Sequence, residues 1–208
     1  MAKLLLIQAH PKTNQFSYSL EVAKHFMNTY QEEHPADTIT VRDVFTDEVP
    51  PINDLTLDAW LKVKKADTHT LSSEQQHLID KHDTWLEEFI NHDKYVFVNP
   101  MYNHFIPAEM KQYIDIVSVA RKTFKYTENG LVGLLEGKKS LHIQAAGGYY
   151  QPDIKVDLGS QYLNDTMLRF GVTPVESIYI EGMSETPEKA TDILNAAISK
   201  ATTLAATF

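Results

Sequence analysis

The chain has no cysteine among its 208 residues. It therefore contains no disulfide bond, no thiolate metal ligand and no cysteine nucleophile. The absence of cysteine also suits a reducing compartment, so we expect a cytoplasmic protein.

Basic residues are scarce, and long apolar runs are missing. Lys and Arg total 19 against 28 Asp and Glu, which gives a formal net charge of −9. This balance argues against a protein that binds the phosphate backbone of nucleic acids. The apolar run at residues 4–7 is too short for a signal-peptide core or a membrane span. We therefore expect a soluble protein that binds neither nucleic acid nor a membrane.

Several motifs with a known chemical purpose are also absent. The sequence has no Gly-x-Gly-x-x-Gly, which would predict a dinucleotide site, and no Walker lysine, which would predict ATP. It has no Gly-x-Ser-x-Gly, which weakens the case for a hydrolase. The histidine spacings match no zinc-enzyme pattern, so no metal site is expected.

Short apolar runs alternate with segments of helical periodicity. The runs predict five strands at residues 4–7, 38–42, 95–98, 141–144 and 177–180, each followed by a helix. Ser72 and Gln75 form a capping-box pattern at one helix start. Asn129-Gly130 predicts a hairpin within residues 123–137. Residues 45–71, broken by Pro50 and Pro51, are expected to be irregular and to form an active-site insertion.

This order predicts one α/β domain over residues 1–208. We expect a doubly wound, five-stranded parallel sheet with helices on both faces. In such sheets ligands bind at the carboxyl ends of the strands, near the point where the strand order reverses.

Three of the expected strand ends lead into loops suited to a ligand. The loop after the first strand, residues 9–19, is rich in amides and hydroxyls and enters a helix, whose free N–H groups can bind a phosphate. The loop after the third, residues 99–107, holds aromatics, Met101 and Asn103 between two prolines, which suits a flat ring. The loop after the fourth has Gly147-Gly148, which lets a ligand approach the backbone. Each loop taken alone is also compatible with an ordinary turn, but together they have the layout that a mononucleotide needs.

Several stretches resemble one family in detail. They are Ala9-His10-Pro11 with Gln15-Phe16-Ser17, then Pro100-Met101-Tyr102-Asn103, and then residues 123–139 with Thr123-Phe124-Lys125-Tyr126-Thr127-Glu128-Asn129-Gly130 at their start. The chain resembles, along essentially its whole length, the flavodoxin-like FMN-dependent NADH-azoreductases and quinone reductases. The resemblance implies a homodimer with bound FMN that takes hydride from NADH and reduces quinones and azo compounds in two-electron steps.

The resemblance also implies residue roles. The implied FMN contacts are His10, Gln15, Phe16, Ser17, Pro100, Met101, Tyr102, Asn103, Ala145, Ala146, Gly147 and Gly148. The implied substrate-pocket residues are His104, Phe105, Phe124, Tyr126 and Tyr149. No protein side chain is expected to act as a catalytic acid, base or nucleophile, because the cofactor carries the chemistry.

Two other functions stay open on the sequence alone. An electron-carrier flavodoxin would bind FMN without a substrate pocket of its own. A flavin-free signalling or hydrolase domain would share only the fold. His10 either contacts the flavin phosphate or caps its own turn, and the choice between NADH and NADPH stays undecided.

Overall fold

Five parallel strands form the central sheet of the computed structural model, which describes residues 1–11, 16–150 and 156–208. The strand order is β2-β1-β3-β6-β7, and each neighbouring pair is parallel. The strands are β1 (Lys3–Gln8), β2 (Thr38–Asp43), β3 (Lys94–Pro100), β6 (Lys139–Ala145) and β7 (Val175–Ile180). The predicted five-stranded parallel sheet is confirmed.

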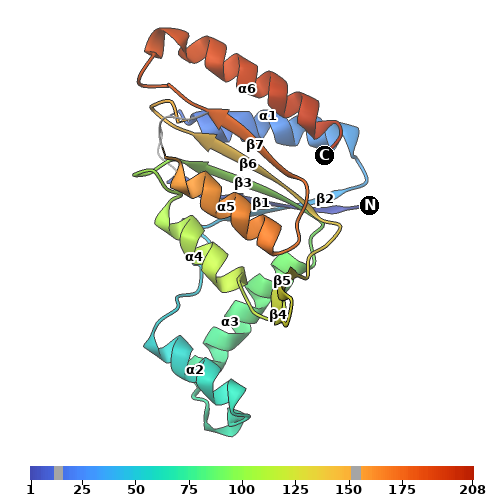
Figure 1. The fold of residues 1–208 in the computed structure, drawn as a ribbon, viewed down its shortest axis with the longest axis vertical. Coiled ribbons are helices and arrows are strands. Elements are labelled where there is room, and N and C mark those ends of the chain that lie inside the picture. Colours follow the sequence, from blue (N-terminus) through green and yellow to red (C-terminus); the bar gives the residue numbers. More distant parts are fainter. Residues whose placement is uncertain (12–15, 151–155) are drawn as a thin grey trace.

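Helices cover both faces of this sheet (Figure 1). On one face lie α1 (Tyr18–Glu33) and α6 (Ala190–Ala205), and on the other lie α3 (Ser73–Ile90), α4 (Ala108–Val117) and α5 (Leu158–Arg169). Each face has its own hydrophobic core. The doubly wound α/β architecture is therefore confirmed.

Strand β1 shows how the two cores share one sheet. Leu4, Leu5, Leu6 and Ile7 are each at most 4% exposed. Leu5 and Ile7 belong to the core under α3, α4 and α5, whereas Leu4 and Leu6 belong to the core under α1 and α6. Because alternate side chains enter opposite cores, every position of the strand must be apolar.

The helix starts follow local signals. α3 begins with the predicted capping box, in which Ser72 and Gln75 bond to each other's main chain. The spacing of Phe16, Leu20, Ala23, Met27 and Tyr30 predicts the apolar face of α1, and this prediction is only partly correct. Phe16 is 62% exposed because it precedes the first helical residue, and the buried face runs through Val22, Ala23, Phe26 and Tyr30. No helix within the described ranges is long and apolar enough to cross a membrane.

The segment 45–71, which we expected to be irregular, contains the helix α2 (Asp54–Lys64). This expectation was wrong because Pro50 and Pro51 lie before the helix rather than inside it. Asn53 is the start signal, since its side-chain oxygen accepts a hydrogen bond from Thr56 N at 3.0 Å. α2 packs against α3 and projects away from the sheet (Figure 1).

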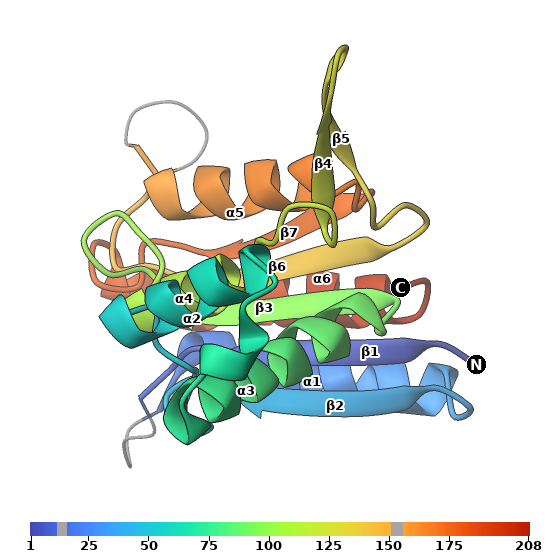
Figure 2. The ribbon, with the colours of Figure 1, turned by 90° about the horizontal axis from the view of Figure 1, so that it is seen from below.

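The predicted hairpin is present as β4 (Phe124–Thr127) and β5 (Gly130–Gly133), which pair antiparallel. It projects from the body of the protein (Figure 2) and rests on the end of α5, where Leu135 N donates to Phe170 O at 2.8 Å. α5 has 12 residues, so its two ends lie about 18 Å apart. The hairpin therefore docks one helix length away from the start of α5.

Gly133 permits this docking. A Cβ atom at Gly133 would lie 2.2 Å from Gly171 N and 2.3 Å from Phe170 C, both of which are main-chain atoms. We expect Gly133→Ala to push the hairpin off α5 and to lower the free energy of unfolding by about 1–3 kcal/mol. Urea denaturation measures the change, and Lys125→Ala at an exposed position of the same hairpin is the control. Equal stability of Gly133→Ala and the wild type would contradict the close approach.

Candidate functional site

Four loops meet at the carboxyl edge of the sheet. We call them the β1 loop (residues 9–11 and 16–17), the β3 loop (101–106), the β6 loop (146–150) and the β7 loop (181–186). A hollow of about 220 Å³ opens between them. Its lining consists of His10, Phe16, Ser17, Tyr18, Ser19, Pro100, Met101, Ala145, Ala146, Gly147, Met183 and Ser184. It lies near β1 and β3, between which the strand order reverses.

Most of the residues expected at the cofactor site line this hollow. They are His10, Phe16, Ser17, Pro100, Met101, Ala145, Ala146 and Gly147. Tyr102, Asn103 and Gly148 belong to the same loops but do not line the hollow itself. Gln15 lies outside the described residues. The structure thus brings together three loops that are far apart in the sequence.

Four lining residues were missed from the sequence. Tyr18 and Ser19 belong to the first turn of α1, just beyond the expected Ser17. Met183 and Ser184 belong to the β7 loop, which was not considered. The rule that ligands bind at strand ends applies to β7 as well, because β7 is the neighbour of β6.

The start of α1 offers main-chain donors to the hollow. Ser17 caps the helix weakly, since its Oγ accepts from Leu20 N at 3.4 Å. Within the described residues, the N–H groups of Tyr18 and Ser19 have no acceptor. His10 donates Nδ1–H to its neighbour Pro11 O at 2.8 Å, which leaves Nε2 for a ligand. This end of the hollow suits an anion.

The β6 loop is held by the β7 loop through its carbonyl groups. Gly147 O accepts from Ser184 N at 2.8 Å and from Glu185 N at 2.9 Å, and Gly148 O accepts from Gly182 N at 3.0 Å. The N–H groups of Gly147 and Gly148 have no acceptor in the described part of the chain. A Cβ atom at Gly147 would lie 3.0 Å from Ser184 Oγ. The two glycines therefore form a narrow cradle with two free donors.

The end of the β6 loop is fixed by carboxylates. Tyr149 N donates to Glu185 at 3.2 Å, and Tyr150 N donates to Glu181 at 3.1 Å. The Tyr149 hydroxyl lies 2.6 Å from Thr186 Oγ1. Tyr149, an expected substrate-pocket residue, therefore lies at the edge of the site and is 36% exposed.

The β3 loop is a tight turn. Tyr102 and Phe105 exchange two main-chain hydrogen bonds of 2.9 Å each. Between them Asn103 and His104 both have positive φ, 50° and 64°, as in the turns that close two-residue hairpins. Tyr102, which is 43% exposed, thus projects from a rigid loop.

A second hollow of about 540 Å³ flanks the other side of the β3 loop. Its lining includes Tyr102, Asn103 and Phe105 together with Phe45 from the segment after β2. The expected pocket residues Phe124 and Tyr126 line neither hollow, because they lie on the hairpin at the far end of α5. Their role in a substrate pocket of the same chain stays a prediction without a contact to support it.

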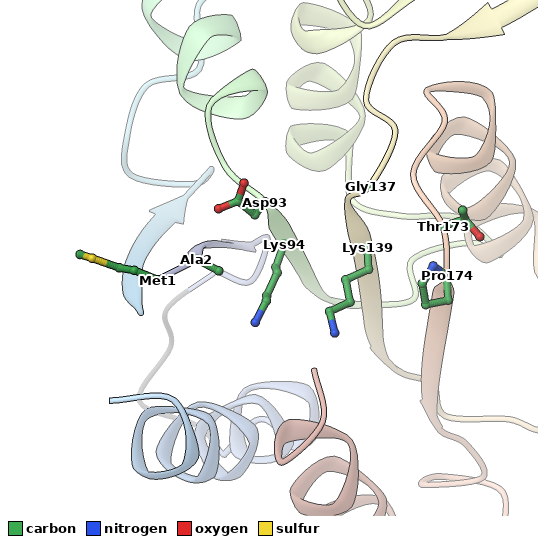
Figure 3. A pocket seen from close by; sticks show the side chains of 8 residues that line it. All are labelled: Met1, Ala2, Asp93, Lys94, Gly137, Lys139, Thr173 and Pro174. Carbon is green, nitrogen blue, oxygen red and sulfur yellow. The ribbon is translucent and has the colours of Figure 1, made fainter. Parts of the chain in front are cut away.

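A hollow of about 490 Å³ lies at the opposite, amino edge of the sheet (Figure 3). Lys94 and Lys139 enter it from β3 and β6. Both ammonium groups already have partners: Lys94 bonds to the Tyr30 hydroxyl at 2.7 Å and to Asp37 at 3.3 Å, and Lys139 bonds to Thr207 O at 3.1 Å. We therefore assign the functional site to the smaller hollow at the carboxyl edge.

Residues 2–204 match a family of proteins with a flavodoxin-like fold. The chain is 51% identical over 211 residues to FMN-dependent NADH:quinone oxidoreductase 2 of Lactiplantibacillus plantarum, covering 100% of both chains. It is 48% identical over 208 residues to FMN-dependent NADH:quinone oxidoreductase 1 of Lactococcus lactis subsp. lactis, covering 97% of both.

Solved structures show the same likeness. An azoreductase from Bacillus anthracis has a TM-score of 0.91 and 33% identity, with 100% of both chains covered. An FMN-dependent NADH-azoreductase from Bacillus anthracis in complex with FMN has a TM-score of 0.89 and 34% identity, covering 99% of this chain and 100% of the other.

The buried residue His142 of β6 makes the stability of the folded protein depend on pH. Burial lowers the pKa of His142 from its ordinary 6.5 to about 4. The unfolded chain therefore binds more protons between pH 6.5 and 4, so stability is complete above pH 6.5 and falls as the pH drops. We expect the free energy of unfolding to fall by about 3 kcal/mol across this window.

Urea unfolding at a series of pH values tests this expectation. The free energy of unfolding should depend less steeply on pH in His142→Gln than in the wild type. The exposed His25→Gln is the control, and identical slopes for all three proteins would contradict the assignment.

Proposed function

The chain belongs to the flavodoxin-like family of FMN-dependent NADH:quinone oxidoreductases and azoreductases, and from this membership we propose that it binds FMN and uses NADH to reduce quinones and azo compounds. The observation that carries the proposal is the meeting of four strand-end loops around one hollow, at the point where the strand order reverses. In sheets of this order, that point is where FMN binds. We place the protein in the cytoplasm, where NADH is available.

The residues around the hollow fit the three parts of FMN. The N–H groups of Tyr18 and Ser19, which have no acceptor among the described residues, would hold the phosphate with Ser17 Oγ at the positive end of the α1 dipole. Met101 and Pro100 would lie along the ring system. The N–H groups of Gly147 and Gly148 would donate to the polar edge of the ring. Neither N–H group has an acceptor among the described residues.

When bound, FMN supplies the two-electron step, accepting hydride from NADH and passing it on to the acceptor. The chain's own contribution is orientation and electrostatics. The donors of Gly147 and Gly148 are held by the β7 loop, so they need no reorganisation when negative charge develops on the ring edge. Tyr102 and Tyr149 would border the place where NADH and the acceptor bind in turn.

The phosphate contact can be tested at Ser17. A hydrogen bond to a charged group is worth roughly 1.5–3 kcal/mol, so Ser17→Ala should weaken FMN binding by at least about tenfold. Riboflavin, which lacks the phosphate, is the matched control and should bind both proteins equally. Flavin fluorescence titration measures both affinities. Equal losses for FMN and riboflavin would assign Ser17 to capping α1 only.

The reaction can be tested by steady-state kinetics with NADH and a benzoquinone. One ring face that serves two substrates in turn predicts parallel double-reciprocal lines. Intersecting lines would show a ternary complex and would contradict a mechanism in which both substrates use the same ring face in turn. An electron carrier without a substrate pocket would instead show FMN binding with no sustained NADH oxidation.

We also propose that the active unit is a homodimer. The hairpin carries exposed apolar side chains, with Tyr126 at 75% and both Leu131 and Val132 at 38% exposure. Exposed apolar surface of this kind marks interaction sites. A second copy related by a two-fold axis would allow each hairpin to cover the other chain's flavin, and two-fold dimers are the commonest oligomers.

A charge on the hairpin tests the assembly. We expect Leu131→Asp to give a folded monomer whose NADH–quinone turnover is at least tenfold lower. A tenfold loss corresponds to an increase of about 1.4 kcal/mol in the activation free energy. Val41→Asp is the control, because Val41 is 52% exposed on β2 at the other edge of the sheet. Light scattering reports the mass. A folded monomer with full turnover would refute the shared site.

A further inference from the structure

A ring of hydrogen-bonded side chains, closed through the main-chain N–H of Ser160, is buried behind the β3 and β6 loops. Its members are Asn99, His142, Gln144, Asp157 and Ser160, each at most 2% exposed. They come from β3, from the second half of β6 and from the start of α5. None of these five side chains lines the hollow, so any effect of the ring on the site passes through the loops.

The bonds run from residue to residue without a gap. His142 Nε2 lies 2.9 Å from Asn99 Oδ1, and Asn99 Nδ2 donates to Gln144 Oε1 at 3.3 Å. Gln144 Nε2 donates to Asp157 Oδ2 at 2.7 Å. Asp157 Oδ1 accepts from Ser160 N at 2.9 Å, and Ser160 Oγ lies 3.5 Å from His142 Nδ1, which closes the ring.

The Asp157 carboxylate gives these bonds one direction. An ionised carboxylate only accepts, so Gln144 must turn its NH₂ toward Asp157 and its oxygen toward Asn99. Asn99 must then turn its NH₂ toward Gln144 and its oxygen toward His142. His142 must therefore carry its proton on Nε2, with Nδ1 left as an acceptor for Ser160 O–H.

One hydrogen bond connects the ring to the start of the β3 loop. The same NH₂ group of Asn99 also donates to Pro100 O at 2.9 Å. Pro100 is the last residue of β3 and lines the hollow. If the Asn99 amide turned over, its oxygen would face the Pro100 carbonyl, and the bond would be lost.

The other end of the β3 loop is held by the start of α5, which Asp157 caps. Gly159 N donates to His104 O at 3.1 Å, and His104 Nδ1 donates to Val156 O at 3.1 Å. A Cβ atom at Gly159 would lie 2.6 Å from Ile106 N. The positive φ values of Asn103 and His104 need such support, because non-glycine residues keep this backbone only where their surroundings hold it.

We propose that the Asp157 carboxylate fixes the direction of the hydrogen bonds that run through Gln144, Asn99 and His142, and thereby holds the Pro100 carbonyl and the β3 loop in the position that receives the flavin. The inference about the ring concerns the protein alone, and its consequence for the flavin rests on the FMN function proposed above. Asp157 is a positioning residue, since it acts through Gln144 and Asn99 rather than by touching the cofactor. A fully satisfied buried network of this kind specifies a single arrangement.

Asp157→Asn is the decisive substitution. Asn also caps helices well, so α5 keeps its start, but the new NH₂ faces the NH₂ of Gln144. Gln144 and then Asn99 must turn over, His142 must move its proton to Nδ1, and Pro100 O loses its donor. Asp165→Asn removes the same charge from an exposed position of α5 and is the matched control.

The first readout is the tautomer of His142, observed by ¹⁵N NMR of the imidazole in the flavin-free protein. We expect protonation at Nε2 in the wild type, in Asp165→Asn and in Ser160→Ala, and protonation at Nδ1 in Asp157→Asn. Retention of the Nε2 tautomer in folded Asp157→Asn would overturn the directional role of Asp157. This readout does not depend on flavin, so it separates the ring from the proposed function.

The second readout is the affinity for FMN and the midpoint potential of bound FMN. We expect Asp157→Asn to weaken FMN binding roughly three- to tenfold, the effect of one neutral hydrogen bond, and to shift the potential, while Asp165→Asn changes neither. A changed tautomer with unchanged affinity and potential would refute the link to the β3 loop. Absence of FMN binding by the wild type would refute the function and leave the tautomer result standing.

A second variant keeps the test valid if Asp157→Asn does not fold. Gln144→Met cuts the connection between Asp157 and Asn99 and leaves the cap of α5 intact. Pro100 O is then the remaining acceptor that orients the Asn99 NH₂ group, so we expect a fraction of His142 to move its proton to Nδ1 and FMN binding to weaken. A single Nε2 tautomer in Gln144→Met would overturn the proposal.

Discussion

The parallel pairing of β1, β3, β6 and β7 is the constraint on which the site depends. The main-chain ladder continues one residue beyond the strands, since Met101 N donates to Ala145 O at 2.8 Å and Ala146 N donates to Ile180 O at 2.9 Å. Each loop therefore leaves the sheet in register with its neighbour. A slip of one residue would displace a loop by about 3.3 Å and turn its side chains to the other face of the sheet. Four separate loops form one hollow because the ladder forbids such a slip.

The same register places polar side chains where an apolar core would be more stable. Asn99 lies opposite Gln144 in the β3–β6 pairing, so the two amides meet at the end of the sheet, under the loops. Burying them costs free energy unless each is paired, and the bonds to Pro100, His142 and Asp157 supply those partners. A buried polar network of this kind contributes a defined geometry more than it contributes stability.

The sequence predicted the strands and the loops at their ends, which buried apolar runs determine. It did not predict the buried ring or the position of the hairpin, which depend on packing between elements. The strands and the three loops follow from local patterns, because the ends of parallel strands must meet at one edge. The β7 loop was missed although the same rule applies to it. The ring was missed because His142 and Gln144 alternate with apolar residues inside a strand, and only the fold shows that they face Asp157. The position of the hairpin depends on the contact of Gly133 with α5, which no local pattern encodes.

Helix α5 connects the β3 loop with the hairpin. The hollow formed by the described residues measures about 220 Å³, below the roughly 300–1,000 Å³ typical of small-molecule sites, and the proposed second copy would enlarge it. The first turn of α5 holds the β3 loop through Gly159 and His104, and its last turn supports the hairpin through Phe170 and Gly133. A helix is a stiff rod over this length. In the proposed two-fold dimer, the element that would cover the partner's flavin is therefore anchored on the same helix that would position the chain's own flavin.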